Sequence, residues 1–282
     1  MNPQPSTELI ACPYCGAEEH SFWADEIGFS AVRCTACALI YVNPRPSLAT
    51  IDMAVRTGVH SAEAHGLDVK SYRDPRKVAR YRRTFAQMFD DIWRSGRPIS
   101  WLDVGAGYGE IVEAVMGLAA PGSRIEGLEP MQPKADNARA RGLAITQDYL
   151  RPGRPPADFV SIVDVFSHVP QFHQFLQDVR SALTPKGEVF VETGNLADLR
   201  SRAEFPGELG LPDHLVFAGE GQLRGFLDQA GFDLVRVQRV RIDGMVNLAK
   251  NVVKKALGRP VRLALPYRSN YRQLLIRARL RA

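Results

Sequence analysis

The chain has 282 residues, of which 45% are hydrophobic, 24% charged and 9% aromatic. This ordinary globular composition excludes wholesale disorder, and no apolar run approaches the roughly 18 residues of a membrane span. The net charge of +5 conceals two opposite ends: residues 236–282 hold thirteen Lys or Arg against one acid, whereas residues 1–46 hold two cations against five acids. The first residues lack a basic start followed by an apolar run, so no secretory signal is expected and a cytoplasmic location is predicted.

The four cysteines form two CxxC turns, Cys12 with Cys15 and Cys34 with Cys37, with eighteen residues between the turns. Two such turns supply four thiolates for one tetrahedral metal ion, zinc first, although iron satisfies the same spacing. A reducing cytosol opposes two disulfides, and a redox role would explain only one turn. Residues 1–46 are therefore predicted to form a zinc ribbon with a structural or substrate-lid role. Its acidic charge does not favour nucleic-acid binding, which needs cations.

Residues 47–98 are interpreted as a helical linker or lid. Their first part gives only weak helical signals, but apolar residues recur at helical spacing from Pro75 to Ser95, and Gly96 is placed to end that helix. Residues 99–282 then alternate strands with helices, which predicts an α/β, Rossmann-like fold with a mostly parallel sheet and an antiparallel last strand. The predicted strands are 99–104, 124–128, 144–146, 159–163, 188–192, 232–241 and 272–279. The predicted helices are 110–118, 132–141, 171–183 and 221–230.

The strongest chemical signal is a glycine-rich turn after the first of these strands. Glycines there let a ligand lie against main-chain N–H groups, because no Cβ intervenes. The next strand ends at Glu129, where an acid accepts both hydroxyls of a ribose. The turn consists of Asp103, Gly105, Ala106, Gly107 and Gly109.

Nicotinamide and S-adenosylmethionine sites share this arrangement, so the detail of the turn matters. The dinucleotide pattern G-x-G-x-x-G places its third glycine one residue later than Gly109. Asp103 before the first glycine and Glu110 after the last suit a cationic ligand better than a diphosphate. A purely structural turn with solvated acids is the remaining interpretation.

The segment Leu102-Asp-Val-Gly-Ala-Gly-Tyr-Gly109 resembles the first motif of class I S-adenosylmethionine-dependent methyltransferases. Other segments resemble later motifs in the same order, and they are most similar to bacterial members with an N-terminal zinc-binding module, which include sugar C-methyltransferases. The resemblance covers roughly residues 9–240 and does not extend to the long C-terminal domain of the sugar enzymes. These segments are Leu39-Ile-Tyr-Val-Asn-Pro-Arg-Pro46, Gly127-Leu-Glu-Pro130, Phe159-Val-Ser-Ile-Val-Asp-Val165, Leu183-Thr-Pro-Lys-Gly-Glu188 and Asp213-His-Leu-Val-Phe217.

The resemblance implies a role for each matching residue. Asp103 would set the turn and approach the amino-acid part of the cofactor, with Gly105 and Gly107 lying against it. Glu129 would hold the ribose. The other implied cofactor contacts are Pro130 beside Glu129, Asp148 and Tyr149 at the adenine, and Asp164 and Val165 beside the methionyl group and the methyl.

Methylation of an alcohol, or of a carbon beside a ketone, requires a base to remove a proton. The resemblance places the base histidine of the sugar C-methyltransferases at His214, with Asp213 orienting it. Leu211 and Asp213 replace that family's tyrosine and glutamate, so only His214 matches strictly, and a hydrogen-bonded structural histidine is the alternative. His168 and Asn195 are candidates for positioning the acceptor.

Residues 245–257 are predicted to form a helix with apolar residues on one face and Lys250, Lys254 and Lys255 on the other. Its apolar face would pack on the core, or the helix would lie on an anionic surface, either membrane lipid or a phosphorylated glycan carrier. RNA is a third partner, although few aromatic residues accompany these cations.

These features predict an S-adenosylmethionine-dependent methyltransferase that acts on a small molecule or saccharide, such as a nucleotide-activated sugar or a surface glycan. An RNA methyltransferase that uses the ribbon and the basic end is one alternative, and it predicts a basic ribbon. A non-catalytic scaffold that binds a partner through the ribbon is the other, and it has no need of an intact glycine turn.

Overall fold

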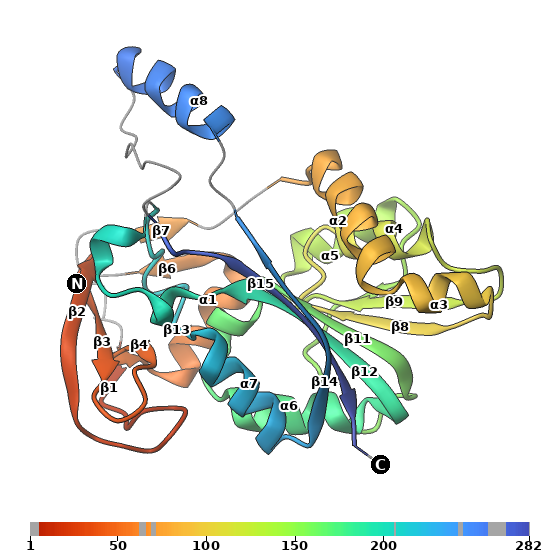
Figure 1. Cartoon of the computed structure of the whole chain (residues 1–282), viewed down its shortest axis with the longest axis horizontal. Helices are drawn as coiled ribbons and strands as arrows, with labels where there is room; N and C mark the ends of the chain where they lie inside the picture. Colours follow the sequence, from red (N-terminus) through yellow and green to blue (C-terminus); the bar gives the residue numbers. More distant parts are fainter. Residues whose placement is uncertain are drawn as a thin grey trace.

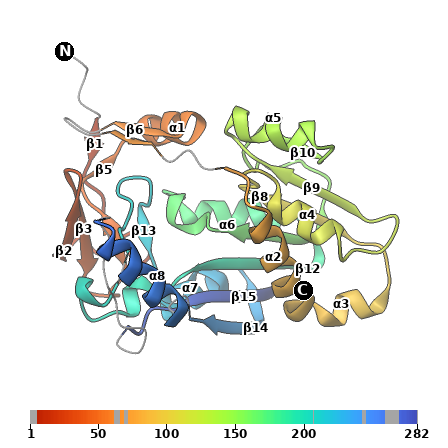
Figure 2. The ribbon, with the colours of Figure 1, turned by 90° about the horizontal axis from the view of Figure 1, so that it is seen from above.

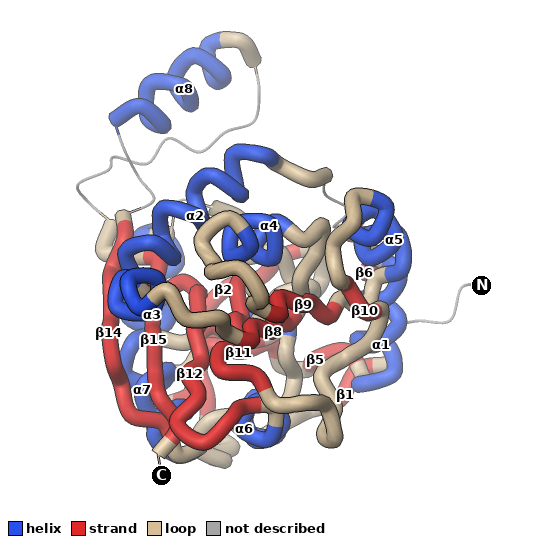
Figure 3. The backbone as a smooth tube through the Cα atoms, turned by 90° about the vertical axis from the view of Figure 1, so that its right-hand side faces the viewer, coloured by secondary structure: helices blue, strands red, loops and turns tan. Residues whose placement is uncertain are grey.

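The computed structural model describes residues 6–61, 66–68, 72–205, 207–241, 245–258 and 269–281. The central sheet consists of β8 (Ser100–Val104), β9 (Arg124–Leu128), β10 (Ile145–Thr146), β11 (Ala157–Val163), β12 (Leu183–Gly194), β14 (Phe232–Val240) and β15 (Gln273–Leu280). Their order is β10-β9-β8-β11-β12-β15-β14 (Figures 1 and 3). The strands from β10 to β12 are parallel, whereas β15 is antiparallel to both of its neighbours. The predicted sheet with an antiparallel last strand is confirmed.

Helices cover both faces of this sheet, as Figure 3 shows. They are α2 (Pro75–Met88), α3 (Asp90–Ser95), α4 (Glu110–Met116), α5 (Gln132–Ala140), α6 (Phe172–Ser181) and α7 (Glu220–Gln229). Because successive strand residues point to opposite faces, Trp101, Phe159 and Phe190 pack under α2 and α4, whereas Val160 and Ile162 pack under α6 and α7. The sheet is therefore packed between two apolar layers, which hold in place the edge where its parallel strands end.

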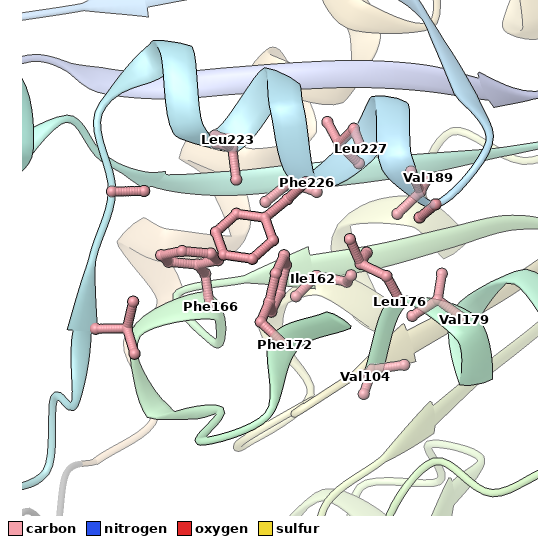
Figure 4. Packing of buried hydrophobic residues seen from close by; sticks show 14 of the residues in the cluster. Val104, Ile162, Phe166, Phe172, Leu176, Val179, Val189, Leu223, Phe226 and Leu227 are labelled. Atoms are coloured by element: carbon pink, nitrogen blue, oxygen red, sulfur yellow. The ribbon is translucent and has the colours of Figure 1, made fainter. Parts of the chain in front are cut away.

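Aromatic side chains join α6 and α7 to the sheet (Figure 4). The ring centroids of Phe166 and Phe172 are 4.4 Å apart, and those of Phe172 and Phe226 are 5.2 Å apart, both edge to face. Such pairs add about 0.5–1.5 kcal/mol beyond the burial of their area. Tyr14 meets Phe226 edge to face at 4.7 Å, so this cluster also holds the N-terminal region.

The single helix predicted from Pro75 to Ser95 is interrupted at Phe89, whose φ of −126° and ψ of 31° are not helical. The Phe89 ring is fully buried, with its centroid 5.0 Å from that of Trp101. The guanidinium of Arg277 lies 4.5 Å from the Phe89 ring centroid and donates to the carbonyl of Met88 at 2.9 Å. Burial of Phe89 in the core thus overrides the local helical pattern.

The other predicted bounds from residue 99 onward lie within two residues of the observed ones, with one exception. The strand predicted at 188–192 extends from Leu183 to Gly194 as β12. Its pairing with β11 is irregular between Ala157 and Phe159, so the segment before Glu188 is extended but out of register. A strand of this kind lacks the apolar run that marks a buried strand in the sequence.

The N-terminal region forms a small sheet at one end of the molecule (Figure 2). It contains β2 (His20–Glu26), β3 (Phe29–Cys34), β4 (Ile40–Val42) and β13 (Val216–Phe217) in the order β13-β4-β3-β2. Separately, β1 (Thr7–Glu8) pairs with β5 (Arg45–Pro46). Because β13 belongs to the larger C-terminal domain, the ribbon and that domain share one sheet.

The segment interpreted as a linker begins with a well-formed helix, α1 (Leu48–Thr57), followed by a hairpin of β6 (Val59–Ser61) and β7 (Gly66–Asp68). The Ser47 hydroxyl accepts from the N–H of Thr50 at 3.4 Å, and Gly58 ends the helix with φ of 73°. Short 3₁₀ turns occur at Phe166–His168, Leu196–Asp198 and Arg202–Glu204. In the described ranges, no helix has the length and apolarity needed to cross a bilayer.

Candidate active site

A cavity of about 580 Å³ lies where β8, β9 and β11 end. Parallel strands end at one edge of a sheet, so the residues that follow them meet there. The volume is typical of ligand pockets. The cavity is lined by eight residues predicted to contact a cofactor, Gly105, Gly107, Glu129, Pro130, Asp148, Tyr149, Asp164 and Val165, and by three predicted at the acceptor, His168, Asp213 and His214.

The main chain after β8 requires glycine. Gly105 and Gly107 have φ of 73° and 54°, in the left-handed region that residues with a Cβ rarely adopt. A Cβ on Gly105 would lie 2.4 Å from Cγ2 of Val165, so these two segments are in close contact. A Cβ on Gly107 would meet nothing nearer than Oε2 of Glu110 at 4.0 Å. Gly107 therefore leaves its main chain open to the cavity.

Glu129 closes the turn from the opposite side. Its side chain is buried, and its two carboxylate oxygens accept from the N–H of Gly107 at 2.7 Å and of Met131 at 2.9 Å. A carboxylate offers about four lone-pair positions, so each oxygen retains capacity to accept from a ligand hydroxyl in the cavity. The predicted pairing of glycine turn and acid is thus present as a direct hydrogen bond.

Three residues of the turn that are predicted at the cofactor do not line the cavity. The N–H of Ala106 donates to the carbonyl of Leu128 at 2.8 Å. A Cβ on Gly109 would lie 2.4 Å from Cδ1 of Leu143, so this glycine permits close packing of the turn on the following segment. Neither residue, nor Asp103, lines the cavity.

Asp103 is buried beneath the turn and accepts from the hydroxyl of Ser161 at 2.5 Å through Oδ1. Within the described residues, its Oδ2 has no hydrogen-bond partner. Burial and, to a lesser degree, the nearby charges of Glu129 and Glu110 raise the pKa of Asp103 to about 8, against the lowering effect of the Ser161 hydroxyl. Asp103 therefore prefers the neutral form unless a cation approaches, which fits a positively charged ligand above the turn.

One wall of the cavity comes from α1, which the sequence interpretation left as an unspecified lid. Ser47 before a run of helical apolar spacing, and Gly58 after it, were the available signals. Asp52 and Tyr149 are hydrogen-bonded partners at this wall, and burial together with that bond raises the pKa of Tyr149 above its usual range. The lining residues of α1 are Leu48, Ile51, Asp52, Ala54 and Val55.

The end of the cavity that is predicted to receive the acceptor holds two imidazoles, 4.6 Å apart between ring centroids. Nδ1 of His214 lies 2.6 Å from the carbonyl of Leu209, and Nδ1 of His168 lies 2.9 Å from the carbonyl and 3.1 Å from Oδ1 of Asp213. Carbonyl oxygens only accept, so each Nδ1 carries a proton. Nε2 is therefore the basic nitrogen of each neutral ring.

The pKa values of the two histidines shift in opposite directions from the usual value of an imidazole. Burial and the charge of His168 both lower the pKa of His214 from 6.5. Burial would also lower the pKa of His168, but its hydrogen bonds and ion pair with Asp213 outweigh burial and raise that pKa above 6.5. Such a split is typical of an acid–base pair. His214 therefore binds a proton less readily than a free imidazole does, and His168 binds one more readily.

Asn195 does not join this group. It is buried at the end of β12, where its side-chain oxygen accepts from the N–H of Arg272 at 2.7 Å. Its amide nitrogen donates to Asp198 at 3.1 Å and to the carbonyl of Asn270 at 3.4 Å. Asn195 therefore fixes the end of the sheet and lies outside the cavity lining.

A carboxylate of the ribbon holds the loop that carries His214. Glu26 of β2 accepts from the N–H of Leu209 at 2.7 Å and of Gly210 at 2.9 Å, and from Nη2 of Arg202 at 3.1 Å. Leu209 is also the residue whose carbonyl binds His214. The sequence interpretation missed Glu26, because no local pattern connects it to a loop 183 residues away.

The four cysteine side chains meet in the ribbon. Sγ of Cys12 lies 3.5 Å from Sγ of Cys37, and Sγ of Cys15 lies 3.6 Å from Sγ of Cys34. All four atoms lie within 4.8 Å of one another. Four thiolates around a tetrahedral zinc ion stand about 3.8 Å apart at the usual Zn–S length of about 2.3 Å, so the cluster fits a metal ion.

A model of the methyltransferase domain family matches residues 72–237, more than half of the chain. Similar solved structures include a putative sarcosine dimethylglycine methyltransferase from Galdieria sulphuraria, with 16% identity and a TM-score of 0.50 over 71% of this chain and 85% of that one. An S-adenosylmethionine-dependent methyltransferase from Mesorhizobium loti has 19% identity and a TM-score of 0.46 over 67% and 96% of the two chains. Comparison with curated proteins found no significant match.

Proposed function

Because this chain belongs to the family of S-adenosylmethionine-dependent methyltransferases, we propose that it methylates a small molecule or a saccharide, such as a nucleotide-activated sugar or a surface glycan. The observation that carries the proposal is that the His168–Asp213–His214 group lines the same cavity as the glycine turn. An acceptor and a cofactor would thus share one partly enclosed space with a base.

The residues at the carboxyl edge fit S-adenosylmethionine. The cofactor supplies, when bound, a methyl group on a positively charged sulfur. Glu129 would accept from the ribose hydroxyls, Gly105 and Gly107 would lie against the amino-acid part, and Asp148 and Tyr149 would contact the adenine. Asp103 lies buried beneath the turn, and a nearby cation would lower its raised pKa, whereas a diphosphate would raise that pKa further.

His214 would accept a proton from the acceptor through Nε2, while the carbonyl of Leu209 keeps its other nitrogen protonated. His168, whose positive charge Asp213 supports, would stabilise negative charge that develops on the acceptor oxygen. These two roles suit methylation of an alcohol or of a carbon beside a ketone, since both groups must lose a proton. Sugars offer such hydroxyls and ketones, together with polar groups for the Asp213 and His168 side chains to orient.

The split histidine pair predicts a bell-shaped dependence of kcat on pH. Activity should rise with pH through the pKa of His214, which lies below 6.5, and fall as His168 loses its charge above 6.5. His168→Gln should remove the falling limb and move the rising limb to higher pH, because the charge of His168 no longer lowers the pKa of His214. Steady-state rates at saturating substrates measure both limbs. An unaltered profile in this variant contradicts the assigned roles.

Glu129→Ala should weaken cofactor binding about a hundredfold, because hydrogen bonds to a charged group contribute roughly 1.5–3 kcal/mol each. Calorimetric titration with S-adenosylhomocysteine measures this change without requiring an acceptor. Glu126→Ala changes a partly exposed acid on β9, the strand that Glu129 follows, and serves as the control. Wild-type affinity in the Glu129 variant would remove this residue from the cofactor site.

The charged residues of the ribbon favour a saccharide methyltransferase over an RNA methyltransferase. Its two cations are used inside the protein: Arg33 donates to the carbonyl of Leu199 at 2.5 Å, and Arg45 pairs with Glu8 at 2.8 Å and donates to the carbonyl of Pro170. Phosphate recognition would need free cations.

We assign a structural zinc ion to the four cysteines, whose closed thiolate set leaves no open position for chemistry.

The test of the proposed function uses labelled S-adenosylmethionine. The protein is incubated with nucleotide-activated sugars, cell glycans and total RNA in parallel, and mass spectrometry locates the transferred methyl group. Label on a saccharide supports the proposal, and label confined to RNA overturns it. Failure to bind the cofactor at all, measured by calorimetry, would favour the non-catalytic scaffold.

A further inference from the structure

A basic helix projects from the edge of the sheet that carries the site. The helix α8 (Met245–Ala256) is inserted between β14 and β15. Val240 of β14 pairs with Gln273 of β15, and Gln273 pairs with Gly194 at the carboxyl end of β12. The insertion therefore leaves the sheet at its carboxyl edge. Figures 1 and 3 show α8 standing apart from the sheet and its covering helices.

One face of this helix exposes apolar side chains. Val252 is 48% exposed, Val253 57% and Leu257 just after the helix 72%. With Ala249 and Ala256, they follow the i, i+3, i+4 spacing that places residues on one stripe. The expected alternative, in which this face packs on the core, does not hold for these described residues.

The rest of the helix is basic. Lys250, Lys254 and Lys255 are exposed, and residues 245–258 contain no acid. Residues 236–282 hold thirteen cations against one acid. The lysines border the apolar stripe, and long lysine stems lie along apolar surface while the ammonium groups reach outward.

We propose that α8 lies on the surface of an anionic phospholipid bilayer. An interfacial helix needs an apolar stripe for the acyl boundary and lysines for anionic headgroups, and α8 has both. RNA would use the lysines but leave the apolar stripe in water. A second copy of α8 would cover the stripe but bring lysines of like charge together. The bilayer accounts for both halves of the helix.

This proposal does not depend on the methyl acceptor, but it has a consequence for access to the site. The insertion and the cavity are both at the carboxyl edge of the sheet, so binding through α8 would hold the cavity edge near the membrane surface. An acceptor at that surface would then be enriched near His214.

Vesicle flotation tests the proposal with the full-length protein. We expect binding to vesicles of phosphatidylcholine with 25% phosphatidylglycerol, on the order of tenfold weaker binding to pure phosphatidylcholine, and loss of binding at high salt. Lys254→Glu with Lys255→Glu, and separately Val253→Asp, should each reduce partitioning about tenfold or more. Lys77→Glu with Arg83→Glu on α2, and Val235→Asp on β14, are matched controls that should bind as wild type.

The opposing outcomes are distinct. Equal binding of wild type and the α8 variants to anionic vesicles overturns the proposal. It is also overturned if wild type does not bind vesicles but binds an RNA homopolymer through the same lysines. The proposal is overturned as well if the wild type does not bind vesicles but forms a dimer in light scattering that Val253→Asp abolishes. The apolar stripe would then contact a second copy of the chain. Calorimetric affinity for S-adenosylhomocysteine, unchanged in every α8 variant, separates this test from that of the proposed function.

Discussion

Replacing His214 with alanine should lower kcat by about 10²–10⁴-fold, the usual contribution of a positioned general base. We assign its Nε2 as the proton acceptor for the substrate, because Asp213 is already engaged by His168. The effect should fall on kcat and leave cofactor affinity within about twofold, since Glu129 and the glycine turn remain in place. Methyl transfer to an identified saccharide acceptor, and titration with S-adenosylhomocysteine, measure the two quantities.

His20→Ala is the matched control for this variant. His20 is an exposed histidine whose Nδ1 lies 2.9 Å from the carbonyl of Glu18, so it has a similar hydrogen bond away from the cavity. Turnover should be unchanged in the control. If His214→Ala keeps its turnover while folded and able to bind cofactor, His214 is a structural histidine and the base must be sought elsewhere. Glutamine at His214, which can donate but not act as a base at neutral pH, should be as inactive as alanine.

Much of the fold could be predicted because it rests on local patterns. Apolar runs and glycine turns mark the strands and the starts of the helices, and the rule for parallel sheets places Gly107 and Glu129 at one edge. The hydrogen bond from the Gly107 N–H to the Glu129 carboxylate depends on the side-chain position, and only the folded structure shows it. The same rule places His168 near that edge, because it follows β11, whereas the position of Asp164 at the cofactor is implied by the family resemblance.

What could not be predicted depends on contacts between distant parts of the chain. His168 and Asp213 are 45 residues apart, and no periodicity shows that one orients the other. The break at Phe89 needs the aromatic cluster around Trp101, which exists only in the folded sheet. The sequence favours Asn195 as an acceptor-positioning residue because it follows a strand. Its side-chain amide is instead engaged in hydrogen bonds with Arg272 and neighbouring residues at the end of β12.

The coupling between the ribbon and the site leads to the second large effect. Removing the zinc ion that we propose for the four cysteines should lower kcat at least tenfold while leaving cofactor affinity nearly unchanged. A structural zinc site contributes folding free energy of its ribbon, and the β2–β3 hairpin runs from the cysteine cluster to Glu26. Without the metal ion, Glu26 would no longer be held against the N–H groups of Leu209 and Gly210. The carbonyl that fixes His214 would then lose its support.

Chelation and Cys34→Ser both test this, with metal content measured by atomic emission and activity on the same sample. Glu26→Ala isolates the proposed link, because it leaves the cysteines intact: it should retain its metal ion yet lower kcat, with the Michaelis constant for S-adenosylmethionine unchanged. Glu19→Ala, an exposed acid of the same ribbon, should behave as wild type. Metal-free protein with full turnover would show that the ribbon does not position His214, and a loss of cofactor affinity equal to the loss of kcat would indicate general unfolding instead.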